Sequence, residues 1–419
     1  MKTPKTLAMI ETQTLDELGH HFERNLNFHV DSEGRQFWKI DGPEIASLAK
    51  LDRLVRLVLE TDLVPFRIRV TMRWESVTVP DVFGRNHRVR QPRYVKVAAP
   101  NSFSNATEGL ANFFSSRELR GGLTVLQQSN PAANQLLHAP HIRLFMDVFF
   151  RHRISECLGG AMDTLVDAEG HTRAEIYNDF SANFHRAMRD SESLRQEWHN
   201  WNLGSHENAA NLSRHLDRLF EKHGSLTVLH LRLFHAKERT NLITSPVEAQ
   251  IQDLQMLRAC RTRFLDRLRR KPALFTDEPG YVWAILPSLE GGYDLHFTLL
   301  FSTVALRRVL ADKTVEAGQL GVVLQDHADQ VGAYWVQMAT GGQGSYLRGD
   351  ANAVLYGPDW VHGEVRADDV ERRGKLMKSL GYLAMRRALV RLKNEPPGQY
   401  FGLPERKVRR SRRRSRTAH

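Results

Sequence analysis

Two apolar runs separated by a short glycine-containing loop constrain the fold of this chain more than any other feature of its sequence. Residues 281–287 read Tyr-Val-Trp-Ala-Ile-Leu-Pro, and residues 293–301 read Tyr-Asp-Leu-His-Phe-Thr-Leu-Leu-Phe. The five residues between them, Ser-Leu-Glu-Gly-Gly, suit a turn. Two strand-like runs joined by a loop of this length predict an antiparallel β-hairpin, so we expect an antiparallel sheet in the second half of the chain.

Alternating and helical patterns extend this prediction. Ser225–Phe234 alternates like a strand, with leucines on one face and His230 and Arg232 on the other. Apolar residues recur at helical spacing in residues 208–223, 246–270 and 368–393. We therefore expect an α+β fold, in which the antiparallel sheet carries helices on one face and a DNA-binding surface on the other.

The first half of the chain mixes helices with a few strands. Ile45–Glu60 has the apolar period of an amphipathic helix, and residues 139–158 and 172–201 are predicted to be further helices. Residues 66–77 alternate like a strand whose polar face carries two arginines. This half contains no internal repeat and no catalytic constellation, so we expect a scaffold or a DNA-site reader. The predicted domains are residues 1–205, mixed but mainly helical; residues 206–395, containing the sheet; and residues 396–419, a basic tail.

The charge balance narrows the choice of partner. Lys and Arg outnumber Asp and Glu by 59 to 48, which gives a net charge of +11. This excess favours a polyanion: DNA, RNA or an anionic membrane surface. No uncharged apolar run approaches the ~18 residues that a membrane-spanning helix needs, and no secretory signal is evident. Cys157 and Cys260 are the only cysteines, which suits a reducing compartment. We therefore expect a cytoplasmic protein without a membrane partner.

The tail concentrates this positive charge. Residues 407–416 read Lys-Val-Arg-Arg-Ser-Arg-Arg-Arg-Ser-Arg and follow a Pro-Pro-Gly helix stop at 396–398. Such a run cannot bury apolar surface and is predicted to be disordered in isolation. We expect it to be a nucleic-acid-binding arm, because each phosphate contact releases counterions; a merely solvated tail is the alternative. Its candidate contacts are Arg409, Arg410, Arg412, Arg413, Arg414 and Arg416.

The second strand of the predicted hairpin carries a candidate metal site. Asp294 and His296 fall on the same face, and residues two apart on one face lie ~7 Å from each other. A carboxylate beside an imidazole suits Mg²⁺ or Mn²⁺. His230 could supply a third ligand if its strand is a neighbour. The alternative is a pair of polar side chains on an open, solvated face.

The predicted helix over residues 368–393 carries a candidate nucleophile. Tyr382 lies off the apolar stripe and, at 100° per residue, shares a side with Lys375, Lys378, Arg386 and Lys393. Cations around a phenol attract a backbone phosphate and favour the phenolate that attacks it. The alternative is an exposed tyrosine on a basic helix that only covers DNA or packs against a neighbour.

The order of these motifs along the chain resembles that of a known protein family. A strand, then a hairpin whose second strand presents a histidine on its polar face, then a helix bearing a tyrosine, is the order of HUH endonucleases. More narrowly, residues from about 226 to 403 resemble the inovirus-type replication protein family (YagK/YfjJ-like) of filamentous phages and prophages. The motifs concerned are Val-Leu-His-Leu-Arg-Leu (228–233), Gly-Tyr-Asp-Leu-His-Phe-Thr-Leu-Leu-Phe (292–301), Gly-Ala-Tyr-Trp (332–335), Gly-Gly-Gln-Gly (341–344), Leu-Gly-Tyr-Leu (380–383) and Phe-Gly (401–402).

The resemblance implies a replication-initiator-like protein of a phage or mobile element, nucleoid-associated in a bacterial host. It implies binding of single-stranded or origin DNA, and nicking with a divalent metal and a covalent 5′-phosphotyrosine at Tyr382. Two positions depart from the family pattern: Asp294 stands where the metal strand would read His-x-His, and Met385 stands where a lysine commonly follows the tyrosine. The alternative is a non-catalytic DNA-binding regulator or a nucleic-acid-packaging protein on the same fold.

Overall fold

The computed structural model describes residues 12–39, 45–115, 133–157, 159–350 and 360–404. The chain divides into two compact units. Unit 1 comprises residues 1–27, 39–206 and 385–395, and unit 2 comprises residues 28–38, 207–384 and 396–419. The main division lies at residue 206, next to the boundary predicted from the sequence, but each unit also includes short segments from the far side of it. Local periodicity carries no information about such exchanged segments.

Unit 1 is built mainly from helices around an aromatic core. Its elements are α1 (Thr12–Asn27), α2 (Ile45–Glu60), β3 (Phe66–Pro80), β4 (Asn86–Pro100), α3 (Asn105–Ser115), β5 (Leu136–His138), α5 (Pro140–Arg151), α6 (Arg173–Asp190), the first part of α7 (Glu192–His223) and β11 (Val390–Leu392). Phe145, Phe180 and Phe184 pack edge to face in this core. The helix predicted from residue 172 begins at a capping box, in which Thr172 and Glu175 satisfy each other's backbone N–H groups.

A late segment of the chain completes unit 1. β11 pairs antiparallel with β5, so the helix predicted over residues 368–393 ends at Leu389 and continues as a strand. Nε1 of Trp201 donates to the carbonyl oxygen of Ala388 at 2.7 Å, and Cζ of Arg391 lies 3.9 Å from the Trp201 ring. These contacts explain why residues 385–395 belong to unit 1.

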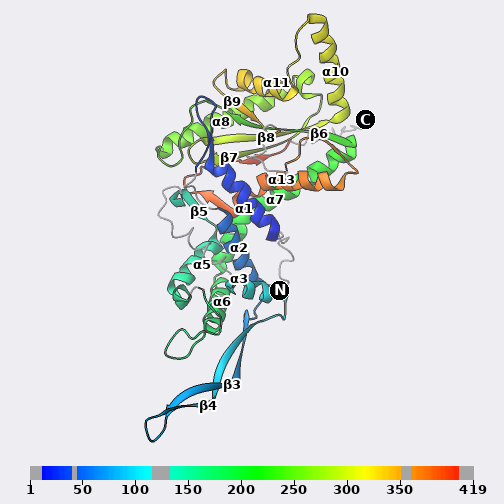
Figure 1. The fold of residues 1–419 in the computed structure, drawn as a ribbon. Helices are drawn as coiled ribbons and strands as arrows, with labels where there is room; N and C mark the ends of the chain where they lie inside the picture. Colours follow the sequence, from blue (N-terminus) through cyan, green and yellow to red (C-terminus); the bar gives the residue numbers. More distant parts are fainter. Residues whose placement is uncertain (1–11, 40–44, 116–132, 158, 351–359, 405–419) are drawn as a thin grey trace, which may run out of the picture. The chain divides into compact units, whose positions relative to one another are not determined.

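Unit 2 is built around the antiparallel sheet that the sequence predicts. The predicted hairpin is β7 (Gly280–Ser288) and β8 (Gly292–Ser302), and the predicted strand is β6 (Ser225–Phe234). The sheet order is β10-β6-β8-β7-β12, with β9 also paired to β6. Figure 1 labels β6, β7, β8 and β9 of this sheet. The remaining elements are β1 (Phe28–Val30), β2 (Gln36–Trp38), the rest of α7, α8 (Val247–Leu268), α9 (Pro272–Phe275), α10 (Thr303–Leu320), α11 (His327–Tyr334), β9 (Ser345–Arg348), β10 (Gly363–Arg366), α13 (Val370–Leu389) up to Ala384, and β12 (Phe401–Gly402). The chain is thus α+β, as expected.

Both faces of the central strands are buried, which differs from the expected open face. β7 is buried along its whole length, and β8 is buried up to its last residue. On one face, Phe297 packs against Phe264 of α8, with ring centroids 5.2 Å apart. On the other, Val282 and Ala284 share a core with Leu380 of α13. Helices therefore cover both faces, and neither face of these strands can receive DNA.

Within the part of the chain that the structure describes, no helix is both long enough and apolar enough to cross a lipid bilayer.

Candidate functional site

The residues predicted to hold a metal come together at the centre of the unit 2 sheet. β6 and β8 are neighbours, and their register places Arg232 opposite His296 and His230 opposite Thr298. Nη2 of Arg232 donates to Oδ2 of Asp294 at 2.6 Å, and Nε2 of His296 lies 3.1 Å from Oδ1 of the same carboxylate. Nδ1 of His230 lies 2.6 Å from Oγ1 of Thr298. We call these five side chains the central polar cluster.

Charges within the central polar cluster balance each other. Burial acts to raise the pKa of Asp294, but the Arg232 guanidinium and His296 outweigh it and hold that pKa at about 2. Burial also lowers the pKa of His296, and it does so more strongly than Asp294 raises it. At neutral pH the cluster therefore contains an ionised Asp294 that pairs with the Arg232 guanidinium, beside a neutral His296 imidazole.

Aromatic residues from distant parts of unit 2 cover this cluster. The ring of Phe28 lies 4.6 Å from Cζ of Arg232, and the ring centroids of Trp360 and His230 are 4.5 Å apart. Arg232, Asp294 and His296 have no exposed surface. Arg232 was predicted to bind nucleic acid, and this prediction is wrong. Its guanidinium is the buried counter-ion of Asp294 and cannot reach a phosphate.

In the central polar cluster, Arg232 competes with a divalent cation for Asp294. The Arg232 guanidinium occupies one oxygen of Asp294, and its positive charge repels a metal ion at the other oxygen. The predicted Mn²⁺ or Mg²⁺ site at Asp294, His296 and His230 therefore stays a prediction, and it would first require Arg232 to release Asp294.

Another group of side chains has the spacing of metal ligands. Across the described residues, Asp167, Glu169 and His171 form the group whose potential ligand atoms lie within 4.8 Å of one another. These residues belong to unit 1. Asp167 already pairs there with Arg153 and with Nδ1 of His171. Arg153 and His171 already compensate the charge of Asp167, so we assign no metal ion to this group.

Tyr382 is buried on α13, with 7% of its surface exposed. The sequence predicted that it lies among cations on an outer face, but residues 382–386 are all buried. Arg386 is itself buried and pairs with Glu395 at 2.6 Å. The sequence pattern predicted that only one apolar stripe of this helix would be buried. In the structure, five consecutive residues are buried, so neighbouring side chains cover more than one side of α13. The basic surface expected around Tyr382 is therefore not formed.

The other predicted cations are distributed differently. Lys375 is exposed and pairs with Glu371 at 2.7 Å, one turn earlier on α13. Lys378 is half-buried, and Lys393 is exposed just after β11. The tail arginines, Arg409, Arg410, Arg412, Arg413, Arg414 and Arg416, lie outside the described residues.

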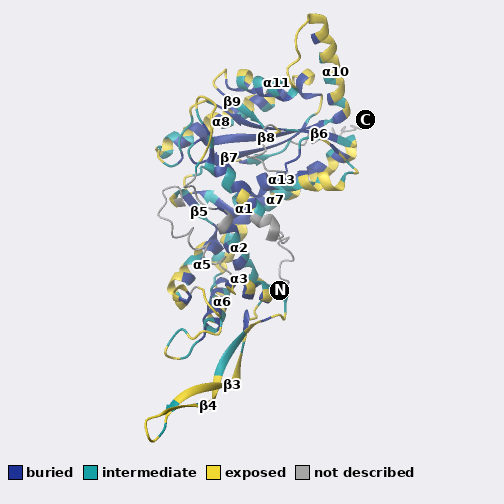
Figure 2. Ribbon diagram, viewed as in Figure 1, coloured by how far each residue is buried: buried dark blue, intermediate teal, exposed yellow. Residues whose placement is uncertain are grey.

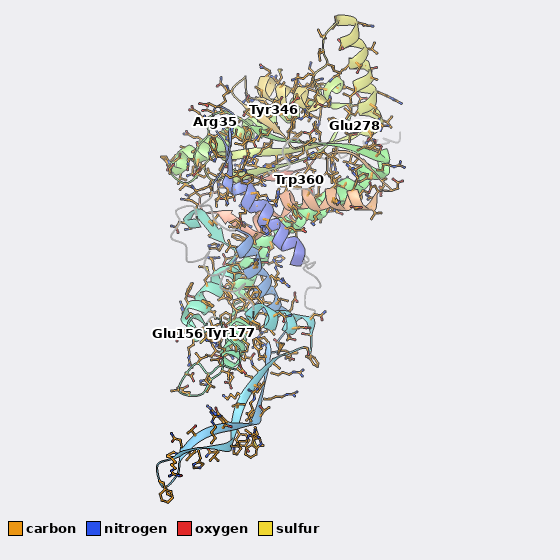
Figure 3. All side chains as sticks on the ribbon, in the orientation of Figure 1. Arg35, Glu156, Tyr177, Glu278, Tyr346 and Trp360 are labelled. Carbon is orange, nitrogen blue, oxygen red and sulfur yellow. The ribbon has the colours of Figure 1, made fainter. Side chains whose placement is uncertain are left out.

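The feature that the sequence analysis did not identify is a long two-stranded ribbon in unit 1. β3 and β4 pair antiparallel along their full length, from Phe66 opposite Pro100 to Pro80 opposite Asn86. At about 3.3 Å per residue, each strand is about 50 Å long. The ribbon extends away from α2, α3 and α6 of its own unit (Figure 1) and is exposed over most of its length (Figure 2). Side chains stand off both of its faces (Figure 3).

The ribbon carries positive charge without matching negative charge. Near its base Lys96 pairs with Glu175, and midway along it Arg93 pairs with Glu75 at 2.9 Å. Further arginines on the ribbon make no ion pair with any residue that the structure describes. Arg67 donates to the amide oxygen of Asn101, and the others are Arg69, Arg73, Arg85, Arg88 and Arg90. Unneutralised guanidinium groups on an exposed surface are the electrostatic pattern of a polyanion-binding site.

Large apolar side chains are exposed between these cations. The register places Met72 opposite Tyr94 and Trp74 opposite Pro92, on the face that also carries Arg88 and Arg90 nearer the tip. Met72, Trp74 and Tyr94 are more than half exposed. Aromatic side chains beside arginines can stack on nucleobases while the guanidinium groups bind phosphate. Alternating residues 66–77 and the Asp-Val-Phe-Gly turn sequence at 81–84 were the available signals for this hairpin.

Comparison of the chain with protein-family models, with curated proteins and with solved structures gave no match. The resemblance to HUH endonucleases and to inovirus-type replication proteins therefore stays a prediction from sequence motifs.

Proposed function

We propose that this protein binds DNA through the β3–β4 ribbon. The observation that carries the proposal is the set of unpaired arginines on a ribbon that is exposed on both faces. Buried or paired arginines would stabilise the fold, whereas the guanidinium groups of Arg69, Arg73, Arg85, Arg88 and Arg90 form no ion pair with an acidic side chain of the described chain. A guanidinium binds phosphate through two parallel hydrogen bonds, which makes arginine well suited to a phosphate backbone.

The shape of the ribbon supports the same conclusion. Two strands lie about 4.8 Å apart, so a two-stranded ribbon is narrow enough to enter a groove of duplex DNA. Its length of about 50 Å spans more than one turn of the double helix, whose repeat is about 34 Å. The cationic tail predicted at residues 407–416 would add further phosphate contacts. Because the tail and the ribbon belong to one chain, DNA bound to the ribbon is at a high effective concentration for the tail.

Of the three functions that the sequence left open, a non-catalytic DNA-binding regulator is favoured over a nicking enzyme, and a nucleic-acid-packaging protein stays the third. Nicking requires the Tyr382 hydroxyl to reach a phosphate and Asp294 to ligate a metal. Tyr382 is buried and Asp294 pairs with Arg232. The role as a replication-initiator-like protein of a mobile element stays a proposal that rests on the resemblance alone.

The test replaces the unpaired arginines. The variant Arg69→Gln, Arg73→Gln, Arg88→Gln and Arg90→Gln should bind duplex DNA more weakly at any sequence. If each arginine contacts one phosphate, the slope of log affinity against log salt should fall by about 3–4 units. The matched control removes equal charge from exposed arginines on α5, α6 and α7, at Arg151, Arg186, Arg189 and Arg195. A slope that falls equally in both variants, or in neither, would remove the ribbon from the proposal.

A further inference from the structure

The loop at the tip of the ribbon, residues 81–85, holds a fixed shape. Oδ1 of Asp81 accepts hydrogen bonds from the backbone N–H groups of Phe83 and Arg85, both at 2.8 Å. The backbone of Asp81 also bonds Arg85 and Gly84, each at 2.9 Å. Gly84 has a φ of 75°, a left-handed conformation that glycine adopts without strain. The two residues between Asp81 and Gly84, Val82 and Phe83, are therefore held outward on a preformed turn.

The same turn occurs a second time in this chain, in the β1–β2 hairpin. There Oδ1 of Asp31 accepts from the N–H groups of Glu33 and Arg35, and Gly34 has a φ of 83°. The two sequences are Asp-Ser-Glu-Gly-Arg and Asp-Val-Phe-Gly-Arg. They share every residue that shapes the turn and differ at the two outward positions. The turn thus tolerates polar residues there, and its geometry gives no reason for valine and phenylalanine.

The apolar pair at the tip is almost fully exposed. Val82 is 94% exposed and Phe83 is 84% exposed. A folded chain gains nothing from presenting these two side chains to water, since each would be stabilised by leaving it. Their position at the end of a cationic ribbon indicates that they contact the same partner as the arginines.

We propose that Val82 and Phe83 form a wedge that inserts between adjacent base pairs of duplex DNA and bends it. This inference rests on the proposed DNA binding by the ribbon. Apolar side chains that enter a base step partly unstack it and kink the duplex, which lets more protein surface reach the DNA. The preformed turn suits this role because the wedge loses little conformational freedom on insertion.

The charges around the tip favour DNA over a protein partner for this wedge. Arg85, Arg88 and Arg90 lie within the loop and the first residues of β4, and none of them pairs with an acid in the described chain. Asp81 is the acidic residue of the loop, and its carboxylate is turned into the backbone N–H groups of the loop itself. The surface around the wedge is therefore positive, which complements the phosphates that flank a base step.

The experiment exchanges the wedge for polar residues, since the β1–β2 turn carries polar residues at the same two positions. The variant Val82→Ser and Phe83→Ser keeps Asp81, Gly84 and Arg85, so the loop should keep its shape. The control is Val323→Ser, which removes an equally exposed apolar side chain from unit 2. DNA bending is measured by energy transfer between dyes at the ends of a duplex of about 30 base pairs. Unstacking is measured with 2-aminopurine, and binding with the same duplex and with one carrying a central mismatch.

The wild-type chain and the control should bend the duplex and raise 2-aminopurine fluorescence. Both should bind the mismatched duplex about tenfold more tightly, since its central step is already partly unstacked. The wedge variant should lose all three effects while keeping its salt slope. A wedge variant that bends DNA like the wild type would overturn the inference, as would salt-dependent binding of wild type without bending. Failure of the wild type to bind either duplex or single-stranded DNA would instead overturn the proposed function itself. Binding of single strands alone would exclude the wedge.

Discussion

Arg232 on β6 donates to Asp294 on β8 at 2.6 Å, and both side chains are fully buried at the centre of the unit 2 sheet. Nε and Nη1 of Arg232 find no hydrogen-bond partner among the residues that the structure describes. The ring of Phe28 lies against this guanidinium instead. The pair thus depends on mutual neutralisation, because few other polar groups stabilise either charge.

Breaking this pair should destabilise unit 2 strongly. Asp294→Asn leaves the Arg232 guanidinium buried without a counter-charge, which typically costs about 3–5 kcal/mol. The double variant Arg232→Met with Asp294→Leu removes both charges and should be more stable than Asp294→Asn. Urea unfolding of the three proteins measures these differences. Equal stability of Asp294→Asn and the wild type would show that the pair contributes nothing.

The same pair predicts how stability depends on pH. The pKa of Asp294 is held at about 2 in the folded chain, below the value of about 3.9 expected when unfolded. Its contribution, on the order of 2 kcal/mol, is complete above pH 4 and is lost as pH falls towards 2. The difference in unfolding free energy between the wild type and the Arg232→Met, Asp294→Leu variant should therefore shift in favour of the variant over that interval. A difference that stays constant from pH 6 to pH 2 would contradict this assignment.

Removing the tail should weaken DNA binding without changing its character. A chain that ends before Arg406 loses Arg406 and the seven cationic residues at 407–416. If three or four of them contact phosphate, the log–log salt slope should fall by about 2–4 units, and by less on single strands. Bending by the tip wedge should persist, because the ribbon is intact. An unchanged slope after truncation would mean that the tail makes no phosphate contact.

Tyr382 provides the test of nicking. Because the side chain is buried, we expect no covalent product when the wild type is incubated with labelled single-stranded oligonucleotides and Mn²⁺. A denaturing gel detects any label that stays attached to the protein. An adduct that forms with the wild type and disappears in Tyr382→Phe would restore the nicking enzyme. Tyr382→Phe should leave duplex affinity and its salt dependence as they are.

The sequence predicted helices and strands well where apolar and polar residues follow a clear helical or alternating period. Ile45–Glu60 and Ser225–Phe234 have the predicted bounds, and the β7–β8 hairpin lies within a residue or so of its prediction. β4 was harder to predict because it contains Pro92 and many cations, which are more typical of loops. A two-stranded ribbon has a free edge on each strand, so a proline without an N–H is tolerated there.

The environment of the candidate site could not be predicted in the same way. Alternation placed Asp294 and His296 on one face of a strand, and the structure places them side by side. The guanidinium of Arg232, which pairs with Asp294, is covered by Phe28, a residue more than 200 positions earlier in the chain that belongs to a separate hairpin. Sequence spacing says nothing about such a cover. For the same reason, Arg232 was assigned to DNA when it is the partner of Asp294.

The two ends of the ribbon meet at one point of unit 1, because Phe66 lies opposite Pro100 in the β3–β4 register. The chain between these residues extends away from the helices of unit 1 and returns to its starting point. A single genetic insertion or deletion could therefore add or remove the whole arm while leaving the helical core intact. Related chains should consequently differ in the length and tip sequence of the ribbon far more than in the residues that pack around Phe145.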